Sequence, residues 1–270
     1  MKFCRPERFV LIVATVCMLM PASAGVAEET ARKQFLAWFE SFNGSVVPPE
    51  VMKAYAAKLT ADGLAESDVR EHMAAVQKYV AAMPSELLAI HFDRIYTAHK
   101  DLFSQEPNGF LVRSIRGVKP GTALDVAMGQ GRNSVFLAMQ GWDVTGYDLS
   151  EKGMAIARAD AAKAGVKLQT VRATHQDFDF GKERWDLIVM TYAFVNMEDT
   201  AFLTRLRDSL KPGGRVIVEQ INAGVGGKGP ANALFHSMQD LRVIHYEDVM
   251  DTAEWSKAPM RLGRILAEKD

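Results

Sequence analysis

Apolar residues recur along this chain with two different spacings, and the change comes near residue 120. Between residues 28 and 83 the apolar positions lie three or four residues apart, as on one face of a helix. This spacing predicts three helices, over residues 28–42, 49–59 and 67–83. Pro49 suits a first helical turn and Ser67 suits an N-cap. After residue 120, short apolar runs alternate with helical stretches, which predicts strand–helix–strand units and a parallel sheet.

The clearest of these units occupies residues 122–150. Its pattern predicts a strand over residues 122–127, a turn containing Gly129 and Gly131, a helix from Arg132, and a second strand that ends at Asp148. The two glycines have no Cβ, so a ligand can lie against the backbone while the helix directs its unpaired N–H groups toward it. A carboxylate at the end of the second strand can accept both hydroxyls of a ribose. The unit therefore predicts an adenosine-binding site.

The residues around the glycines indicate which adenosine ligand binds. A dinucleotide site has a third glycine where Ser134 stands, and it has no acid where Asp125 ends the first strand, a place that suits a cationic ligand. The run Asp125-Val-Ala-Met-Gly129-Gln-Gly131 resembles the first motif, [DE]-x-G-x-G-x-G, of the class I S-adenosylmethionine-dependent methyltransferases. The resemblance implies S-adenosyl-L-methionine as the cofactor. Ala127 replaces the first glycine of that motif, which weakens or reshapes the cofactor pocket.

Two segments upstream resemble the tellurite-resistance and thiopurine-type branch of that family. They are the run from His91 to Tyr96, which contains Phe92-Asp-x-x-Tyr96, and the run Pro107-Asn108-x-x-Leu111. The resemblance implies that Tyr96 and Asn108 close the pocket over the methionine half of the cofactor. The alternative is that Phe92 and Tyr96, one turn apart, only cover the sheet. With the later stop Lys-Pro-Gly-Gly at residues 211–214, the resemblance extends over residues 92–268.

The resemblance implies one set of cofactor contacts. The candidate cofactor-binding residues are Asp125, Ala127, Gly129, Gly131, Asn133, Asp148, Leu149, Asp177, Tyr96, Asn108 and Thr191. Asp177 is included because Thr174 stands where many relatives place an acid that binds the adenine; a backbone contact, with Asp177 in a solvated loop, is the alternative. No catalytic residue is assigned and no metal site is expected, since His175 and His245 are single histidines, which are more often structural.

The expected architecture is a doubly wound, mostly parallel seven-stranded sheet, the Rossmann-like methyltransferase fold, with its last strand antiparallel and a helical N-terminal appendage. The later strands are expected at residues 167–173, 185–191, 215–220, 241–249 and 260–268, and helices at 151–163 and 198–210. Ser150 is expected to cap the first of these helices. Residues 223–229 are interpreted as a substrate-side loop or a plain linker. The expected division is residues 1–24, a signal peptide, 25–90, the appendage, and 91–270, the methyltransferase domain.

The N-terminus and the charge bear on location and partners. Lys2, Arg5 and Arg8 precede a short apolar run and the sequence Ala22-Ser-Ala24, the pattern of a signal peptide cleaved after Ala24. Both cysteines lie inside that segment. We therefore expect an exported protein with no membrane contact after cleavage; the alternative is an anchored protein whose domain faces the cytoplasm, where S-adenosylmethionine is made. The net charge of −1 gives no reason to expect a nucleic-acid partner.

Together these observations predict an enzyme, an S-adenosylmethionine-dependent methyltransferase. It would move a methyl group to a small-molecule acceptor by in-line displacement, which depends on alignment more than on covalent assistance. The sequence leaves the acceptor and the oligomeric state open. The alternative function is a non-catalytic protein that binds an adenosine ligand or acts as a scaffold, and an NAD-dependent oxidoreductase is a poorer third.

Overall fold

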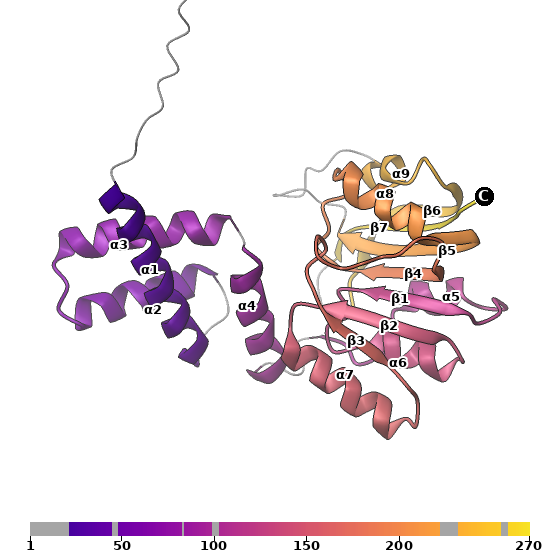
Figure 1. Ribbon diagram of the computed structural model, residues 1–270, viewed down its shortest axis with the longest axis horizontal. Coiled ribbons are helices and arrows are strands. Elements are labelled where there is room, and N and C mark those ends of the chain that lie inside the picture. Colours follow the sequence, from indigo (N-terminus) through magenta and orange to yellow (C-terminus); the bar gives the residue numbers. More distant parts are fainter. Residues whose placement is uncertain (1–21, 45–47, 83, 99–102, 222–231, 255–258) are drawn as a thin grey trace, which may run out of the picture.

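The computed structural model describes residues 22–44, 48–82, 84–98, 103–221, 232–254 and 259–270. These residues form a helical lobe and an α/β domain (Figure 1). No helix among the described residues is both long and apolar enough to span a membrane. The signal peptide stays a prediction, because all but its last three residues lie outside the described part, and the loop at 223–229 lies outside it too.

The α/β domain is built on a seven-stranded sheet of order β3-β2-β1-β4-β5-β7-β6. The strands are β1 (Thr122–Val126), β2 (Asp143–Asp148), β3 (Gln169–Arg172), β4 (Trp185–Thr191), β5 (Leu210–Ile221), β6 (Arg242–Thr252) and β7 (Pro259–Glu268). The first five pair in parallel, and β7 runs antiparallel to both β5 and β6. The expected fold, with an antiparallel last strand, is confirmed.

Helices cover both faces of this sheet, and the alternation of side chains along β4 shows why. Leu187 and Val189 pack on one face, beside α5 (Gly109–Ser114) and α6 (Arg132–Met139). Ile188 and Met190 pack on the other face, beside α8 (Thr200–Ser209) and α9 (Ala233–Ser237). Since successive side chains of a strand point to opposite faces, residues 187–190, which are buried on both faces of the sheet, must all be apolar. The remaining helix of this domain, α7 (Glu151–Lys163), contacts α6, β2 and β3.

Two local expectations were wrong. Ser67 does not cap its helix, because α3 (Glu66–Ala81) begins one residue earlier and Ala65 is its N-cap. The Lys-Pro-Gly-Gly segment does not lie outside the fifth strand, because β5 begins at Leu210 and pairs there with Trp185 across a shift of register. Gly214 is needed at that shift, since a Cβ on it would lie 2.8 Å from the carbonyl oxygens of both Lys211 and Trp185.

The helical lobe has a core of its own. It contains α1 (Ala22–Ser41), α2 (Pro48–Ala61), α3 and α4 (Ser85–Ala98). Phe35, Tyr55 and Val76 are each at most 1% exposed at its centre. The Tyr55 hydroxyl lies 3.0 Å from His72 Nε2, so its polar end is also satisfied. The lobe is thus a packed unit and not a set of loosely attached helices.

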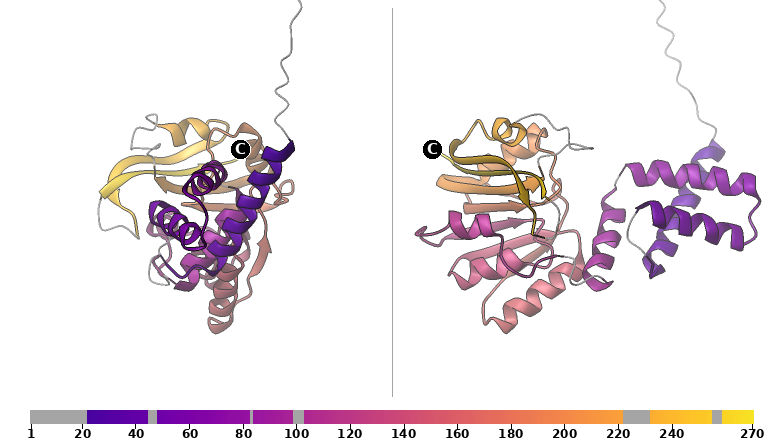
Figure 2. Two further views of the ribbon diagram at one scale, coloured as in Figure 1. Left: turned by 90° about the vertical axis from the view of Figure 1, so that its left-hand side faces the viewer. Right: turned by 180° about the vertical axis from the view of Figure 1, so that it is seen from behind.

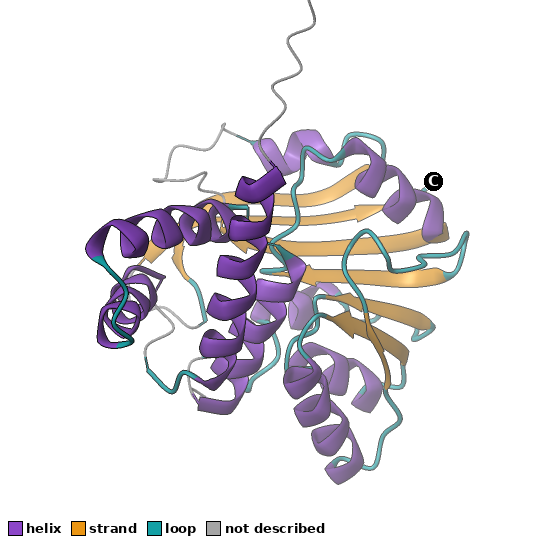
Figure 3. Cartoon of the chain, turned by 60° about the vertical axis from the view of Figure 1, so that its left-hand side comes forward, coloured by secondary structure: helices purple, strands orange, loops and turns teal. Residues whose placement is uncertain are grey.

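Helix α4 joins the lobe to the α/β domain. It packs against α1 on one side and against α7 on the other. The parallel strands run toward the side of the molecule where α4 and the lobe lie (Figures 1, 2 and 3). Ligands in open α/β sheets bind at the carboxyl ends of the strands. The lobe therefore lies on the side of the sheet where a ligand is expected.

Replacing Phe35 by Ala should destabilise the lobe by about 3–5 kcal/mol, because a buried aromatic side chain is lost and a cavity remains. Denaturant unfolding followed by circular dichroism measures this. Lys33→Ala, at a side chain that is 69% exposed on the same helix, is the control and should change stability by less than about 0.5 kcal/mol. Equal unfolding curves for the two variants would contradict the assignment of this core.

Candidate functional site

The carboxylate of Asp148 is tied to the glycine turn. Its Oδ2 accepts a hydrogen bond of 2.8 Å from Gly129 N, and its Oδ1 accepts one of 2.8 Å from Ser150 N. The residue is 8% exposed, and burial raises its pKa while the backbone donors lower it. Each carboxylate oxygen has a second lone pair, so the same group can also accept hydroxyls of a ligand. The structure thus places the predicted ribose acceptor at the end of β2 and fixes its orientation.

The two glycines of the turn have different constraints. Both have positive φ, 55° at Gly129 and 77° at Gly131. A Cβ on Gly131 would lie 2.4 Å from the Cβ of Ala157, so this glycine allows α7 to pack against the turn. A Cβ on Gly129 would lie 2.4 Å from the Tyr96 hydroxyl oxygen, so this glycine allows Tyr96 to lie against the turn. The contact of either glycine with a ligand stays a prediction.

Ala127 adopts the conformation of the glycine that it replaces. Its φ is 53°, in the left-handed region that residues with a Cβ rarely occupy. Such a conformation costs on the order of 1–2 kcal/mol in a residue other than glycine. Ala127 and Gly129 both lie in this region, so the backbone at Ala127 has a conformation that glycine adopts more readily.

Asp125 lies behind the turn and is almost completely buried, at 2% exposure. Its Oδ2 accepts a hydrogen bond of 2.6 Å from Ser134 Oγ. Burial raises its pKa to about 7, and the hydrogen bond from Ser134 opposes that effect. A cation bound nearby would favour the ionised form of this carboxyl group. The charge of Asp125 therefore changes near neutral pH, and its effect on a ligand stays a prediction.

Asn133 and Asn108 connect the turn to the neighbouring strand. Asn133 Nδ2 donates to Thr191 Oγ1 at 2.8 Å, and Asn133 Oδ1 accepts from Asn108 N at 2.9 Å. The side chain of Asn108 caps α5 by accepting from Leu111 N and donates to two glutamates, Glu219 at 2.9 Å and Glu254 at 3.0 Å. The predicted residues Asn108, Asn133 and Thr191 are thus brought together, and the side-chain donors of Asn108 are engaged within the protein.

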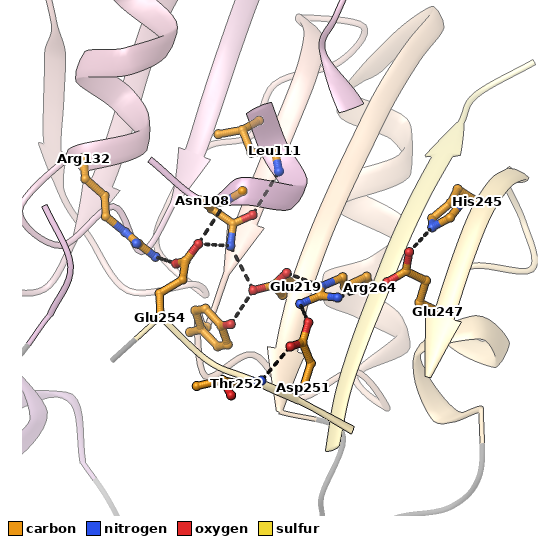
Figure 4. A network of polar contacts seen from close by, with 12 residues as sticks. Asn108, Leu111, Arg132, Glu219, His245, Glu247, Asp251, Thr252, Glu254 and Arg264 are labelled. Atoms are coloured by element: carbon orange, nitrogen blue, oxygen red, sulfur yellow. Dashed lines mark hydrogen bonds and ion pairs between the residues drawn. The ribbon is translucent and has the colours of Figure 1, made fainter. Parts of the chain in front are cut away.

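Those two glutamates belong to a polar network that the sequence did not predict (Figure 4). Glu219, 2% exposed at the end of β5, accepts from Arg264 Nε on β7 at 2.5 Å and from the Tyr192 hydroxyl. Glu254 pairs with Arg132 at the start of α6 and accepts from Gly109 N. In the sequence, the one feature that could have indicated this network was Glu219, a glutamate at the end of an apolar strand.

Tyr96 brings α4 onto the glycine turn. It is 8% exposed, and its ring stacks with that of Phe92 at a centroid distance of 6.2 Å. Burial, together with the nearby charge of Asp148, raises its pKa. The Tyr96 ring lies against Gly129 and Gly153, at the glycine turn and the start of α7. Whether Tyr96 covers the methionine half of a cofactor stays a prediction.

The last predicted residues lie beyond β2. Leu149 follows Asp148 directly, and its carbonyl oxygen accepts a hydrogen bond from Arg172 Nε at 3.2 Å. Asp177 is exposed and accepts from Thr174 Oγ1 at 2.7 Å, in a turn that this threonine also stabilises. Among the described residues, no hydrogen bond joins Asp177 to the glycine turn, and its contact with adenine stays a prediction.

His175 and His245, the two histidines considered in the sequence, form hydrogen bonds within the protein. His175 lies between the Tyr147 hydroxyl, 2.9 Å from its Nδ1, and the carbonyl oxygen of Ala193, 3.1 Å from its Nε2. Burial lowers the pKa of His175. His245 lies on β6 and pairs with Glu247 at 2.8 Å. The described residues contain no cluster of metal-ligating side chains.

The pKa of Asp125 predicts a pH dependence of stability. Because its folded-state pKa of about 7 is above the usual 3.8, its contribution to stability is complete below about pH 4 and is lost as the pH rises through 7. Relative to Asp125→Asn, the wild-type protein should lose up to about 4 kcal/mol between pH 4 and pH 8. Denaturant unfolding at both pH values measures this, with the exposed Asp143→Asn as the control. A constant difference between the wild type and Asp125→Asn would show that the carboxyl group is already ionised at pH 4.

Comparisons with known proteins agree with this geometry. Residues 123–214 match the methyltransferase domain family. A probable S-adenosyl-L-methionine-dependent methyltransferase, TehB of Haemophilus influenzae, is 30% identical over 105 residues, which cover 37% of this chain and 36% of TehB. A ubiquinone biosynthesis O-methyltransferase of Sinorhizobium medicae is 32% identical over 152 residues, covering 54% of this chain and 60% of that protein. This chain therefore spans less than two thirds of the length of these curated relatives.

A solved structure supports the fold. The crystal structure of TehB from Haemophilus influenzae aligns with a TM-score of 0.55 and 22% identity, over 66% of each chain. At this identity the likeness concerns the fold, and the family match concerns the segment that carries Asp125, Gly129 and Asp148. Residues 123–214 thus match a methyltransferase domain family, and TehB is one of the proteins to which this chain is similar in sequence and in fold.

Proposed function

We propose that this protein binds S-adenosylmethionine at the carboxyl ends of β1 and β2 and transfers its methyl group to a small-molecule acceptor. The observation that carries the proposal is the carboxylate of Asp148, held by Gly129 N and Ser150 N at the place where a ribose is bound in this fold. The cofactor family follows from the domain, and the acceptor class is part of the proposal.

The residues present fit this cofactor. Asp148 has lone pairs for the two ribose hydroxyls, and the hydrogen bond from Gly129 N holds its carboxylate in place. Asp125 supplies a negative charge in a buried position, which suits a ligand that carries a positive charge. A pyrophosphate would instead be repelled there. The site thus favours a cationic adenosine ligand over a dinucleotide.

The protein's contribution to the reaction is alignment. When bound, S-adenosylmethionine supplies a methyl group activated by its positively charged sulfur. The chain holds the two reactants in line, and such alignment can contribute on the order of 7–11 kcal/mol. The bonds from Asn133 to Thr191 and from Asp148 to Gly129 fix the elements around the site. Tyr96, packed over the glycine turn, keeps water from that side of it.

The relatives support a small acceptor. Their names are those of ubiquinone biosynthesis O-methyltransferases and of a TehB methyltransferase. The alternative of a non-catalytic scaffold is not favoured by these matches. The left-handed conformation of Ala127, which keeps the backbone path of a glycine, also argues against loss of the cofactor site.

Calorimetric titration with S-adenosylhomocysteine and with NAD tests the proposal. The full chain should bind S-adenosylhomocysteine and not NAD. Asp148→Ala should weaken that binding about 10-fold to 150-fold, because hydrogen bonds to a charged acceptor contribute about 1.5–3 kcal/mol. Asp143→Ala removes an exposed carboxylate at the opposite end of the same strand and should leave the affinity unchanged.

Two results would contradict the proposal. Tighter binding of NAD than of S-adenosylhomocysteine would favour an oxidoreductase. Wild-type affinity in Asp148→Ala, in a variant whose melting temperature is also that of the wild type, would remove Asp148 from the ribose site.

A further inference from the structure

The start of α7 is held by a carboxylate from another helix. Asp93, on α4, accepts a hydrogen bond of 2.5 Å from Ser150 Oγ and one of 3.0 Å from Lys152 N, both at its Oδ1. Ser150 is the N-cap of α7, and its Oγ accepts from Gly153 N. Two backbone N–H groups at the start of this helix are thus satisfied, one by its own cap and one by α4. A negative charge is also favourable at this end of a helix.

Ser150 lies between Asp93 and the carboxylate of Asp148. It is fully buried, its hydroxyl gives its one proton to Asp93, and its backbone N–H donates to Asp148 Oδ1 at 2.8 Å. The other oxygen of Asp148 accepts from Gly129 N. A series of hydrogen bonds therefore runs from α4 to the glycine turn, with Ser150 and Asp148 as its links.

The two carboxylates of this series do not attract each other. Burial raises the pKa of Asp148, the backbone donors of Ser150 and Gly129 lower it, and the nearby charge of Asp93 raises it. The charge of Asp93 therefore opposes that of Asp148. Any favourable effect of Asp93 on the site must then come from the hydrogen bonds that it accepts, and not from its charge.

A glycine in the first turn of α7 allows α4 to approach closely. A Cβ on Gly153 would lie 2.9 Å from Tyr96 Cδ2 and 2.9 Å from the carbonyl oxygen of Gly129. Glycine inside a helix costs about 0.5–1 kcal/mol relative to alanine, and the contact with α4 accounts for its presence here. Tyr96 lies one turn after Asp93 on the same side of α4. The two residues together hold α4 against α7 and the glycine turn.

The other side of α4 belongs to the helical lobe. Leu87 is part of the lobe's core, and Arg94 Nη2 donates to the carbonyl oxygen of Gly44 at 2.9 Å while the guanidinium lies 4.4 Å from the centre of the Phe39 ring. Helix α4 lies between the lobe and α7 (Figure 1). Because a helix moves as one body, a displacement of the lobe would also displace Asp93.

We propose that Asp93 is a positioning residue of the cofactor site, through which α4 and the lobe packed on it hold the Asp148 carboxylate in place. Asp93 acts through Ser150, and Ser150 acts through Asp148. A binding group keeps its geometry only where the residues behind it fix its orientation. The inference rests on the proposed function for the part that Asp148 plays in binding, while the hydrogen bonds behind Asp148 can be tested without a ligand.

Amide hydrogen exchange in the ligand-free full chain, followed by NMR, tests the series of bonds. Asp93→Ala should speed exchange at Gly129 N, the far end of the series, by roughly twofold to tenfold, the effect of losing one ordinary hydrogen bond. Asp93→Asn keeps an acceptor oxygen and should restore the wild-type rate. Glu86→Ala is the control, because it removes a carboxylate of the same helix that pairs with Arg32 in the lobe, and it should leave the rate at Gly129 unchanged.

Calorimetric titration with S-adenosylhomocysteine tests the effect on binding. Asp93→Ala should weaken binding by roughly twofold to tenfold, while Asp93→Asn and Glu86→Ala should bind as the wild type does. In a Ser150→Ala background, Asp93→Ala should have no further effect, because the residue through which it acts is changed. A role in stability alone would lower the melting temperature of Asp93→Ala and leave both its affinity and its exchange at Gly129 as in the wild type.

The outcomes distinguish this inference from the proposed function. Equal exchange at Gly129 in Asp93→Ala and Glu86→Ala would overturn the inference, and so would an equal loss of affinity in Asp93→Ala and Asp93→Asn, which would assign the effect to charge. If S-adenosylhomocysteine fails to bind the wild type, the proposed function fails, while exchange at Gly129 still decides whether Asp93 holds Asp148. Should Asp93→Ala fail to fold, Ser150→Ala takes its place in the exchange measurement, and a wild-type rate at Gly129 there would overturn the inference.

Discussion

The hydrogen bonds of the Asp148 carboxylate are the interaction on which the site depends. One oxygen holds the backbone of Gly129, and the other holds the backbone of Ser150, whose own side chain caps α7 by accepting from Gly153 N. A single side chain thus fixes the end of β2, the glycine turn and the start of α7 relative to one another. Since the charge of a buried carboxylate is costly unless it is compensated, the same backbone donors that shape the turn also make the charge tolerable.

The sequence predicted those parts of the site that depend on local spacing. The glycines, Asp125 and Asp148 follow one another within a single strand–helix–strand unit, so periodicity and turn chemistry were sufficient to place them. The boundaries of β4 were predicted to the residue, because its buried residues 187–190 form a continuous apolar run. The N-cap of α3 was not, because Ala65 occupies it without a side-chain hydrogen bond.

The polar network around Glu219 could not be predicted in the same way. Glu219, Glu254 and Arg264 come from β5, from the end of the β6 segment and from β7, and Asn108 joins two of them from more than 100 residues away in the sequence. Nothing in the spacing of these residues indicates that they meet. Their contacts follow from the order of the strands, in which the last strand, β7, inserts between β5 and β6. Long-range polar contacts of this kind depend on topology, and only the fold reveals them.

Strained backbone conformations occur at the ends of two neighbouring strands, β1 and β4. Ala127 lies at the end of β1, and Tyr192 and Phe194 lie at the end of β4, the strand that pairs directly with β1. Neighbouring parallel strands therefore both end in left-handed residues that carry a Cβ. Each strain is compensated by interactions around it: the hydrogen bonds of Asp148 hold the first turn, and the backbone of Glu219 holds the second. Because a relaxed turn at either strand would direct its side chains elsewhere, the strain at these positions maintains the side-chain directions at this edge of the sheet.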